Sequence, residues 1–378
     1  MLKRFRYPLL LLLLTFLSSL IFWLIFYTNL PGKIGFSNTT LETIYANYDG
    51  PNHLVISKCG YQKDCIGPSF SLSLPLEYYP AHFPGYPIII NFFDLFTTGT
   101  KALLLATLSG SLFLSLISYY FFKLFLKDKK AFILTLLLLF FPPRLFILRQ
   151  IGAPETCFLA SILSSLYFFK QKKYLLSALL AALAQTFKSP AVLLTLTYGI
   201  YALYLFFSKK ESFLSLLKKY SFYLLTPLTI ISIFFLYQSQ TENFWAYFHS
   251  GDNFHLSSLP YQVFISTKSW IGSIWLEEIL YIYFFAIYAV YKLFKKYKFT
   301  PLTLFPAIFT LATLFVAHRD ISRYIAPVYP FVLLAFHKKL TQKPVLIIFI
   351  LLLPAILLYA INFVIGNVAP ISDWTPYL

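Results

Sequence analysis

The chain has 378 residues, of which 58% are hydrophobic, 20% aromatic and only 12% charged. Its mean hydropathy is +0.70, which is typical of a polytopic membrane protein whose core is made of lipid-embedded helices. The formal net charge of +17 is compatible with nucleic-acid binding, but the positions of the charges argue against that class. We predict one all-α integral membrane domain over residues 1–378, with the bilayer as a partner and no nucleic acid.

The first apolar run covers residues 8–30 and follows Lys3, Arg4 and Arg6. This run is too long for the hydrophobic region of a signal peptide, and no small-residue cleavage site follows it. The sequence therefore predicts an uncleaved first membrane span.

Lysines interrupt the apolar runs in short clusters, which extend over Lys123–Lys130, Lys170–Lys173, Lys209–Lys219, Lys292–Lys298 and Lys338–Lys343. When spans alternate from a cytoplasmic N-terminus, these clusters fall inside and most acidic residues fall outside. The positive-inside rule thus predicts a multi-pass protein of the cell membrane with a cytoplasmic N-terminus and an extracytoplasmic C-terminus. A basic rim facing anionic lipid explains the high isoelectric point.

The spacing of these clusters predicts about eleven transmembrane helices, at ~20 residues each. Two of them lie between Lys130 and Lys173, with a turn that carries Arg144, Arg149 and Glu155. Residues 174–207 predict two short or re-entrant helices that turn at "FKSPAV", where Pro190 breaks the helix and Lys188 lies near the outer face. Later spans are expected near residues 222–240, 270–291, 300–317, 321–337 and 344–365.

Two segments, residues 31–101 and 241–269, are predicted to be extracytoplasmic loops. In the first, "NTTLETIYANY" places apolar residues at helical spacing, which predicts an interfacial helix. The next stretch, "DGPNHLVISKCGY", has Pro51 at a first helical position and Gly60 at a C-terminal cap. Asp49 is therefore predicted at or just before a second helix N-terminus, where the helix dipole and free amides would keep its carboxylate ionised.

The position of Asp49 allows two interpretations. It is either only a helix N-cap, a common role for Asp before a helix, or a functional carboxylate in a long ordered loop. The functional interpretation is favoured by the segment in which the loop returns to the membrane. This segment, "EYYPAHFPGYPIII" over residues 77–90, carries His82. The functional interpretation is also favoured by "AHRDISRYIAP" over residues 317–327, whose charges lie at an outer span boundary where they are costly to bury. Arg319 and Arg323 are four residues apart and would share a helix face if the helix has begun.

The order Asp49, "GPNHLVISKCGY" and "HFPGYP" resembles a pattern of the GT-C superfamily of glycosyltransferases, D-G-x-x-Y-x-x-I-A-x-x-G-Y followed by F-F-P-x-Y-P. It is most similar to the family of the second mannosyltransferase of GPI-anchor assembly and its bacterial homologues. The segments "GAPETCFLASIL", "FKSPAVLL" and "HRDISRYIAPVYP" extend the resemblance over nearly the whole chain. It departs from the pattern at His53, where an aromatic residue often lies, and at Pro51-Asn52 after Asp-Gly.

This resemblance implies an inverting transfer of a sugar, expected to be mannose, from a polyprenyl-phosphate carrier to a lipid or glycan acceptor outside the cell. Such a displacement needs one base, which the family pattern places at Asp49. The leaving phosphate needs cations or hydrogen-bond donors, and Arg323 and Lys188 are the favoured ones. The other candidates for substrate binding are His82, Arg144, Glu155, His318, Arg319 and Tyr324.

No cofactor or metal is predicted. The sequence has no Asp-x-Asp pair and no glycine-rich phosphate loop, although His82 with Glu155 stays open as an alternative metal pair. Cys59 and Cys65 share the outer loop, where a disulfide is compatible with an oxidising compartment, and Cys157 is expected to be an inert core thiol.

Three alternatives remain. A lipid or sugar transporter or flippase would also have many aromatic-rich spans, but transporters place polar residues at mid-membrane and often contain repeated halves. A non-catalytic scaffold of a cell-envelope complex would not need Asp49. An aminoarabinose or oligosaccharyl transferase would share the GT-C architecture and differ in its acceptor.

Overall fold

The computed structural model describes residues 2–70, 74–251, 255–265 and 273–378. Within these residues the regular secondary structure is helical, apart from two isolated antiparallel bridges, Asn47 to Val368 and Leu256 to Val316. The all-α prediction is confirmed for this part of the chain.

The helices of the first half are α1 (Leu2–Tyr27), α2 (Leu30–Lys33), α3 (Leu41–Tyr45), α4 (Gly50–Cys59), α5 (Lys63–Ser69), α6 (Gly85–Asp94), α7 (Gly99–Lys123), α8 (Asp128–Phe140), α9 (Pro143–Leu148) and α10 (Glu155–Lys170). Those of the second half are α11 (Tyr174–Phe187), α12 (Val192–Phe207), α13 (Phe213–Tyr220), α14 (Leu225–Thr241), α15 (Ser273–Tyr297), α16 (Pro301–Thr313), α17 (Ile321–Tyr324), α18 (Tyr329–Leu340) and α19 (Lys343–Ile365).

Five helical segments in the described residues are long and apolar enough to cross a membrane: Phe5–Tyr27, Gly99–Lys123, Ser189–Phe207, Phe213–Thr241 and Lys343–Ile365. Two shorter apolar helices, Tyr174–Phe187 and Pro301–Thr313, accompany them. These helices are those of a multi-pass membrane protein, although by length and composition they are fewer than the predicted eleven.

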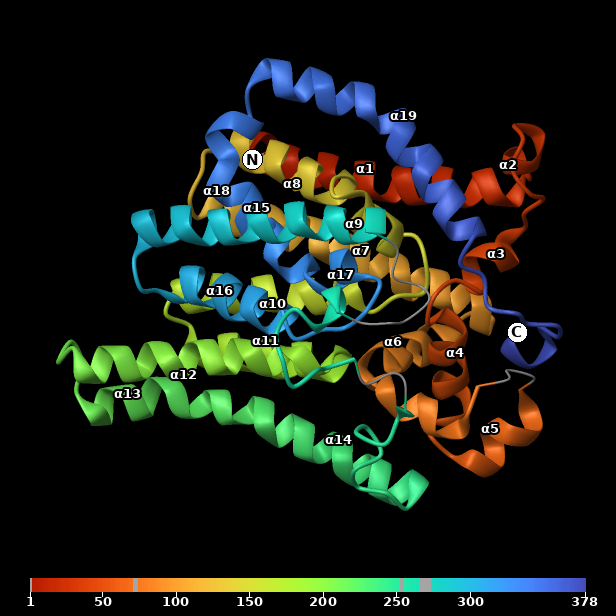
Figure 1. Ribbon diagram of the computed structural model, residues 1–378, viewed down its shortest axis with the longest axis horizontal. Coiled ribbons are helices and arrows are strands. Elements are labelled where there is room, and N and C mark those ends of the chain that lie inside the picture. The colour runs from red at the N-terminus through yellow and green to blue at the C-terminus, as the bar shows by residue number, and fades with distance from the viewer. Residues whose placement is uncertain (1, 71–73, 252–254, 266–272) are drawn as a thin grey trace.

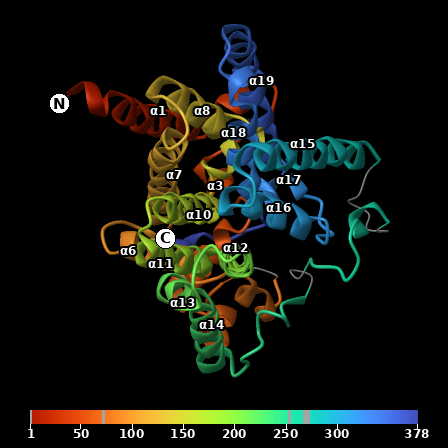
Figure 2. The same cartoon turned by 90° about the vertical axis from the view of Figure 1, so that its left-hand side faces the viewer.

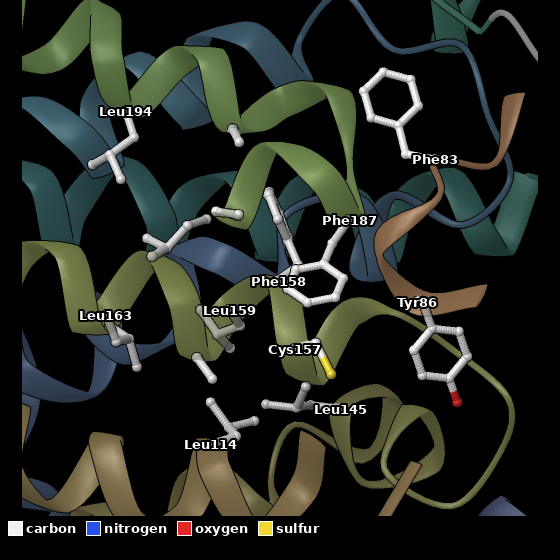
Figure 3. Close-up of a cluster of buried hydrophobic side chains, with 14 of the residues drawn as sticks. Phe83, Tyr86, Leu114, Leu145, Cys157, Phe158, Leu159, Leu163, Phe187 and Leu194 are labelled. Atoms are coloured by element: carbon white, nitrogen blue, oxygen red, sulfur yellow. The ribbon is translucent and has the colours of Figure 1, made fainter. Parts of the chain in front are cut away.

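The helices pack as a bundle around α7 and α10. Helix α10 lies against α7 and α11, α1 lies against α7 and α8, and α15 packs on α16 and α18. Figures 1 and 2 show α19 and α14 at opposite edges of this bundle. In the core, Phe158 and Leu159 of α10 meet Phe187 of α11 and Leu114 of α7 (Figure 3), and burial of such side chains contributes roughly 1.5–3 kcal/mol each.

The two ends of the bundle differ in chemistry. Figure 1 shows the α12–α13 and α15–α16 turns at one end and α3 to α6 with the C-terminus at the other. The turns contain lysines, of which Lys209 and Lys298 adopt the left-handed conformation at φ 53°. We call the opposite end, with α3 to α6, the loop end. The lysine turns and the loop of Asp49 thus lie apart, as the charge pattern predicted.

Several local predictions are confirmed. Helix α4 begins directly after Asp49, and Gly60, at φ 60°, caps its C-terminus. Residues 174–207 form two helices, α11 and α12, separated by a turn of 3₁₀ helix over Ser189–Ala191 that includes Pro190.

Other predictions need correction. The interfacial helix expected from "NTTLETIYANY" is only α3, because Asn47 turns away to donate from Nδ2 to the Val364 carbonyl of α19 at 2.6 Å. The span predicted over 321–337 is interrupted: α17 ends at Tyr324 and α18 starts at Tyr329. Pro327 and Pro330 cannot donate backbone hydrogen bonds, which explains why a continuous helix does not form there.

A close approach of two glycines fixes the start of α4. A Cβ atom built on Gly152 would lie 2.8 Å from the Cα of Gly50 and 2.8 Å from a side-chain carbon of Leu103. Only glycine allows this backbone contact. It joins the residue after Asp49 to the turn before Glu155, so the carboxylates of two distant segments are brought to one place.

We expect Gly152→Ala to destabilise the protein by about 1–3 kcal/mol, because the added methyl group overlaps backbone and Leu103 atoms. Gly199→Ala is the control: Gly199 lies within α12 with no atom within 4 Å of the added Cβ, so this change should be neutral or stabilising by up to about 1 kcal/mol. Thermal unfolding in detergent, followed by tryptophan fluorescence, measures both. Equal melting temperatures for the two variants would show that the glycine contact is not needed.

Candidate functional site

A chain of ion pairs at the loop end joins five of the predicted site residues. Arg323 donates from Nη2 to Asp49 Oδ2 at 2.6 Å and from Nε to Glu155 Oε1 at 2.6 Å. Lys188 donates from Nζ to the same Glu155 oxygen at 2.6 Å. His82 Nε2 lies 3.4 Å from the second oxygen of Asp49. We call these residues the Asp49 cluster.

Helix termini supply most of the cluster. Asp49 precedes α4, Glu155 is the first residue of α10, and Lys188 follows α11 with extended backbone angles (φ −153°, ψ 140°). His82 follows the 3₁₀ helix Leu76–Ala81, while Arg323 lies in the short helix α17. Charged side chains at helix ends reach one point without crossing the apolar bundle interior, where an unpaired charge would be costly.

Asp49 and Lys188 are the most exposed members of the Asp49 cluster, and Glu155 is buried. The side chains of Asp49 and Lys188 are 29% and 28% exposed, whereas those of Arg323 and Glu155 are 10% and 4% exposed. A ligand that approaches the site therefore meets a carboxylate and an ammonium group first. Arg323 and Glu155 connect these two groups through ion pairs.

Asp49 does not act as a helix cap, although it occupies the N-cap position. Its side chain makes no capping hydrogen bond to α4, so the expected stabilisation by free helix amides is wrong. The partners are instead Arg323 and His82. Burial works against ionisation, but the guanidinium of Arg323 and the imidazole of His82 outweigh it and hold the pKa of Asp49 well below its ordinary value.

A second group of polar side chains, which we call the Asp320 group, lies beside the cluster and contains Arg144, another predicted residue. Arg144 Nε lies 3.0 Å from Asp320 Oδ1, and its Nη1 donates to the hydroxyl of Tyr48 at 3.1 Å. Tyr48 in turn donates to Asp320 Oδ2 at 2.5 Å, and Ser322 donates to Oδ1 at 3.1 Å. The guanidinium of Arg144 also stacks on Phe363, 3.9 Å from the ring centre.

The three remaining predicted residues are His318, Arg319 and Tyr324, and they make other contacts. His318 accepts at Nδ1 from the backbone amide of Asp320 at 3.0 Å, and its ring lies 5.2 Å from that of Tyr324. Arg319 instead donates to Asn367 at 3.4 Å. Arg319 and Arg323 do not share a helix face, because α17 begins only at Ile321.

Asp320 and Tyr48 are not among the residues that the sequence predicts for the site. Both had a local signal, since Asp320 lies between two predicted cations in "HRDISR" and Tyr48 directly precedes Asp49. The helical spacing of apolar residues in "NTTLETIYANY" predicts Tyr48 on the apolar face of an interfacial helix. The structure instead gives it φ 49°, outside any helix.

The ring of His53 packs against His82 of the Asp49 cluster and against Tyr86. Its ring makes edge contacts with His82 at 5.2 Å and with Tyr86 at 5.0 Å between ring centres. Among the described residues neither ring nitrogen has a hydrogen-bond partner. Burial, followed by the neighbouring His82, lowers the pKa of His53 to about 3, so the ring is neutral at physiological pH.

Cys59 and Cys65 form a disulfide at the C-terminal end of α4, and Cys157 is a buried free thiol. The turn inside the disulfide carries Tyr61, whose hydroxyl donates to the carbonyl of His82 at 2.7 Å. The bridge therefore supports one side of the Asp49 cluster.

No group of three or more His, Cys, Asp or Glu side chains in the described residues is arranged to hold a metal ion. His82 and Glu155, the alternative metal pair, instead contact Asp49 in one case and Arg323 with Lys188 in the other.

No protein-family model matches the chain, and no curated protein matches it at a significant level.

We expect His53→Phe to make stability less dependent on pH. A histidine with a folded pKa of about 3 and an unfolded value near 6.5 contributes stability that is fully present above pH 6.5. That stability is lost as the pH falls, by up to about 1.4 kcal/mol per pH unit. Phenylalanine keeps the ring contacts and binds no proton. Melting temperatures between pH 7.5 and 4.5 measure the slope, and a variant slope as steep as that of the wild type would contradict this account.

Proposed function

We propose that the protein is an inverting glycosyltransferase of the membrane. It moves a sugar, expected to be mannose, from a polyprenyl-phosphate carrier to a hydroxyl of a lipid or glycan acceptor on the extracytoplasmic side. The observation that supports this best is the Asp49 cluster: an accessible carboxylate, Asp49, and an accessible cation, Lys188, linked through Arg323 and buried Glu155.

The proposal includes a GT-C-like architecture of about eleven spans, a cytoplasmic N-terminus and an extracytoplasmic C-terminus. The separation of the lysine turns from the loop end (Figure 1) supports this orientation. The loop end then faces outward, where a polyprenyl phosphate presents its head group at the membrane surface.

The reaction needs one proton transfer and one bond exchange. Asp49 takes the proton of the acceptor hydroxyl as the acceptor oxygen attacks the anomeric carbon. The bond from that carbon to the phosphate oxygen breaks, and polyprenyl phosphate leaves with the electron pair and an added negative charge. Arg323 and Lys188 are within one ion-pair chain and would stabilise that charge.

The ion pair between Arg323 and Asp49 links phosphate binding by Arg323 to proton acceptance by Asp49. In the structure Arg323 is shared between two carboxylates, which keeps Asp49 a weak base. A donor phosphate would compete for the guanidinium, because Arg binds phosphate through two parallel hydrogen bonds. As Arg323 turns toward the phosphate, Asp49 loses its counter-charge and becomes more basic. Donor binding would thereby activate the base.

We expect Asp49→Asn to lower sugar transfer by about 10²–10⁴-fold, since amides do not accept the proton at neutral pH. Purified protein is incubated with radiolabelled polyprenyl-phosphate mannose and a lipid and glycan extract as the acceptor. Asp64→Asn is the matched control, because Asp64 is an exposed residue of α5 in the same loop. Full activity of the Asp49→Asn variant would show that Asp49 is not the catalytic base. Failure of the wild type to transfer from any polyprenyl-phosphate sugar would overturn the enzyme proposal in favour of a transporter or scaffold.

A separate binding prediction tests the competition for Arg323. We expect Asp49→Asn to bind polyprenyl phosphate about 3–10-fold more tightly than the wild type, because a competing negative charge is removed, which corresponds to ~1 kcal/mol. Arg323→Gln should bind at least about 30-fold more weakly. Dissociation constants in detergent measure both effects. Weaker binding by Asp49→Asn would mean that the carboxylate supports the donor rather than competing with it.

A further inference from the structure

We propose that Tyr48 is a positioning residue that fixes the plane of the Arg323 guanidinium for phosphate binding. This inference rests on the proposed function, in which Arg323 is a phosphate ligand. Tyr48 connects the Asp49 cluster to the Asp320 group, and none of the catalytic roles above depends on it.

The ring of Tyr48 covers one face of Arg323. The guanidinium carbon lies 4.5 Å from the ring centre, within the range of a cation–π contact. The next residue, Asp49, binds the edge of the same guanidinium at 2.6 Å. Two consecutive residues therefore hold the face and the edge of a single cation.

The hydroxyl of Tyr48 is itself held at two points. It donates to Asp320 Oδ2 at 2.5 Å and accepts from Arg144 Nη1 at 3.1 Å. Asp320 lies directly before α17, the helix that carries Arg323. The hydrogen bond therefore ties the Asp49 loop to the same helix, and the side chain cannot swing away from the guanidinium about its Cα–Cβ bond without breaking both contacts.

The backbone of Tyr48 supports a specific role for this residue. Its φ of 49° lies in the left-handed region, which is uncommon for a bulky side chain and costs about 1–3 kcal/mol. Neighbouring contacts hold the turn, since Gly50 donates to the Asn47 carbonyl at 3.1 Å and Asn47 is anchored to α19. Strain at the residue next to a proposed base favours a role in ordering the site.

A fixed plane matters because a guanidinium binds phosphate as a planar fork. Without the ring, an Arg323 guanidinium that a phosphate has drawn away from Asp49 would be free to rotate about its side chain. It would then present the fork to a phosphate in only a fraction of molecules. The expected defect is thus in donor binding and not in acceptor binding or in the proton transfer.

The test compares Tyr48→Leu, which removes the ring, with Tyr48→Phe, which removes only the hydroxyl. The probe is polyprenyl phosphate, with its dissociation constant measured in detergent. We expect Tyr48→Leu to bind at least tenfold more weakly and to raise the donor KM with an unchanged acceptor KM. Tyr48→Phe should recover most of the affinity and bind about two- to threefold more weakly than the wild type. Tyr27→Leu, at an exposed tyrosine of α1, is the control.

A purely structural role would lower the melting temperature of Tyr48→Leu and leave the dissociation constant unchanged, which would overturn the inference. If Tyr48→Leu does not fold, the folded Tyr48→Phe decides: affinity equal to that of the wild type overturns the inference, and a two- to threefold loss supports it. In the Arg323→Gln background Tyr48→Phe should have no further effect. A wild type that transfers no sugar and binds no polyprenyl phosphate refutes the proposed function itself, which separates the two failures.

Discussion

The guanidinium of Arg323, shared between Asp49 and Glu155, is the interaction on which the loop end depends. Removal of either carboxylate would leave a cation that is only 10% exposed with incomplete pairing, and such a loss is more costly than the net gain from the intact pair. This one side chain joins the start of α4, the start of α10 and α17. Through Glu155 it also holds Lys188 at the end of α11. Four segments that are distant in sequence are therefore fixed to one another by charge.

The charges around Arg323 are balanced before any ligand arrives. Asp49 and Glu155 face Arg323 and Lys188, and Asp320 faces Arg144. An anionic substrate has to take over a cation that already has a partner, which favours exchange of partners over simple addition. These paired charges lie at the loop end, where they come from the termini of α4, α10 and α11 and from the short helix α17.

Local signals in the sequence predicted local features well. Pro51 and Gly60 placed α4, and Pro190 placed the turn between α11 and α12, because these residues restrict their own backbone. Long-range pairing could not be predicted in the same way. Asp49 has the sequence of a helix cap, and only the fold reveals that its partner is Arg323, which is 274 residues away. The prediction of one helix over residues 321–337 is wrong. Hydropathy does not register that Pro327 and Pro330 lack the backbone donors that a continuous helix needs.

Small backbone features explain how so many polar groups meet in a chain with few charges. Gly152 lets two turns touch, Tyr48 adopts a left-handed conformation and Lys188 leaves its helix in an extended one. Each feature is unfavourable or neutral for the segment in which it lies, and each directs a side chain toward Arg323 or Glu155. Local conflicts of this kind persist where function requires them. Their convergence on one cation supports the proposed site more strongly than the presence of any one acidic residue does.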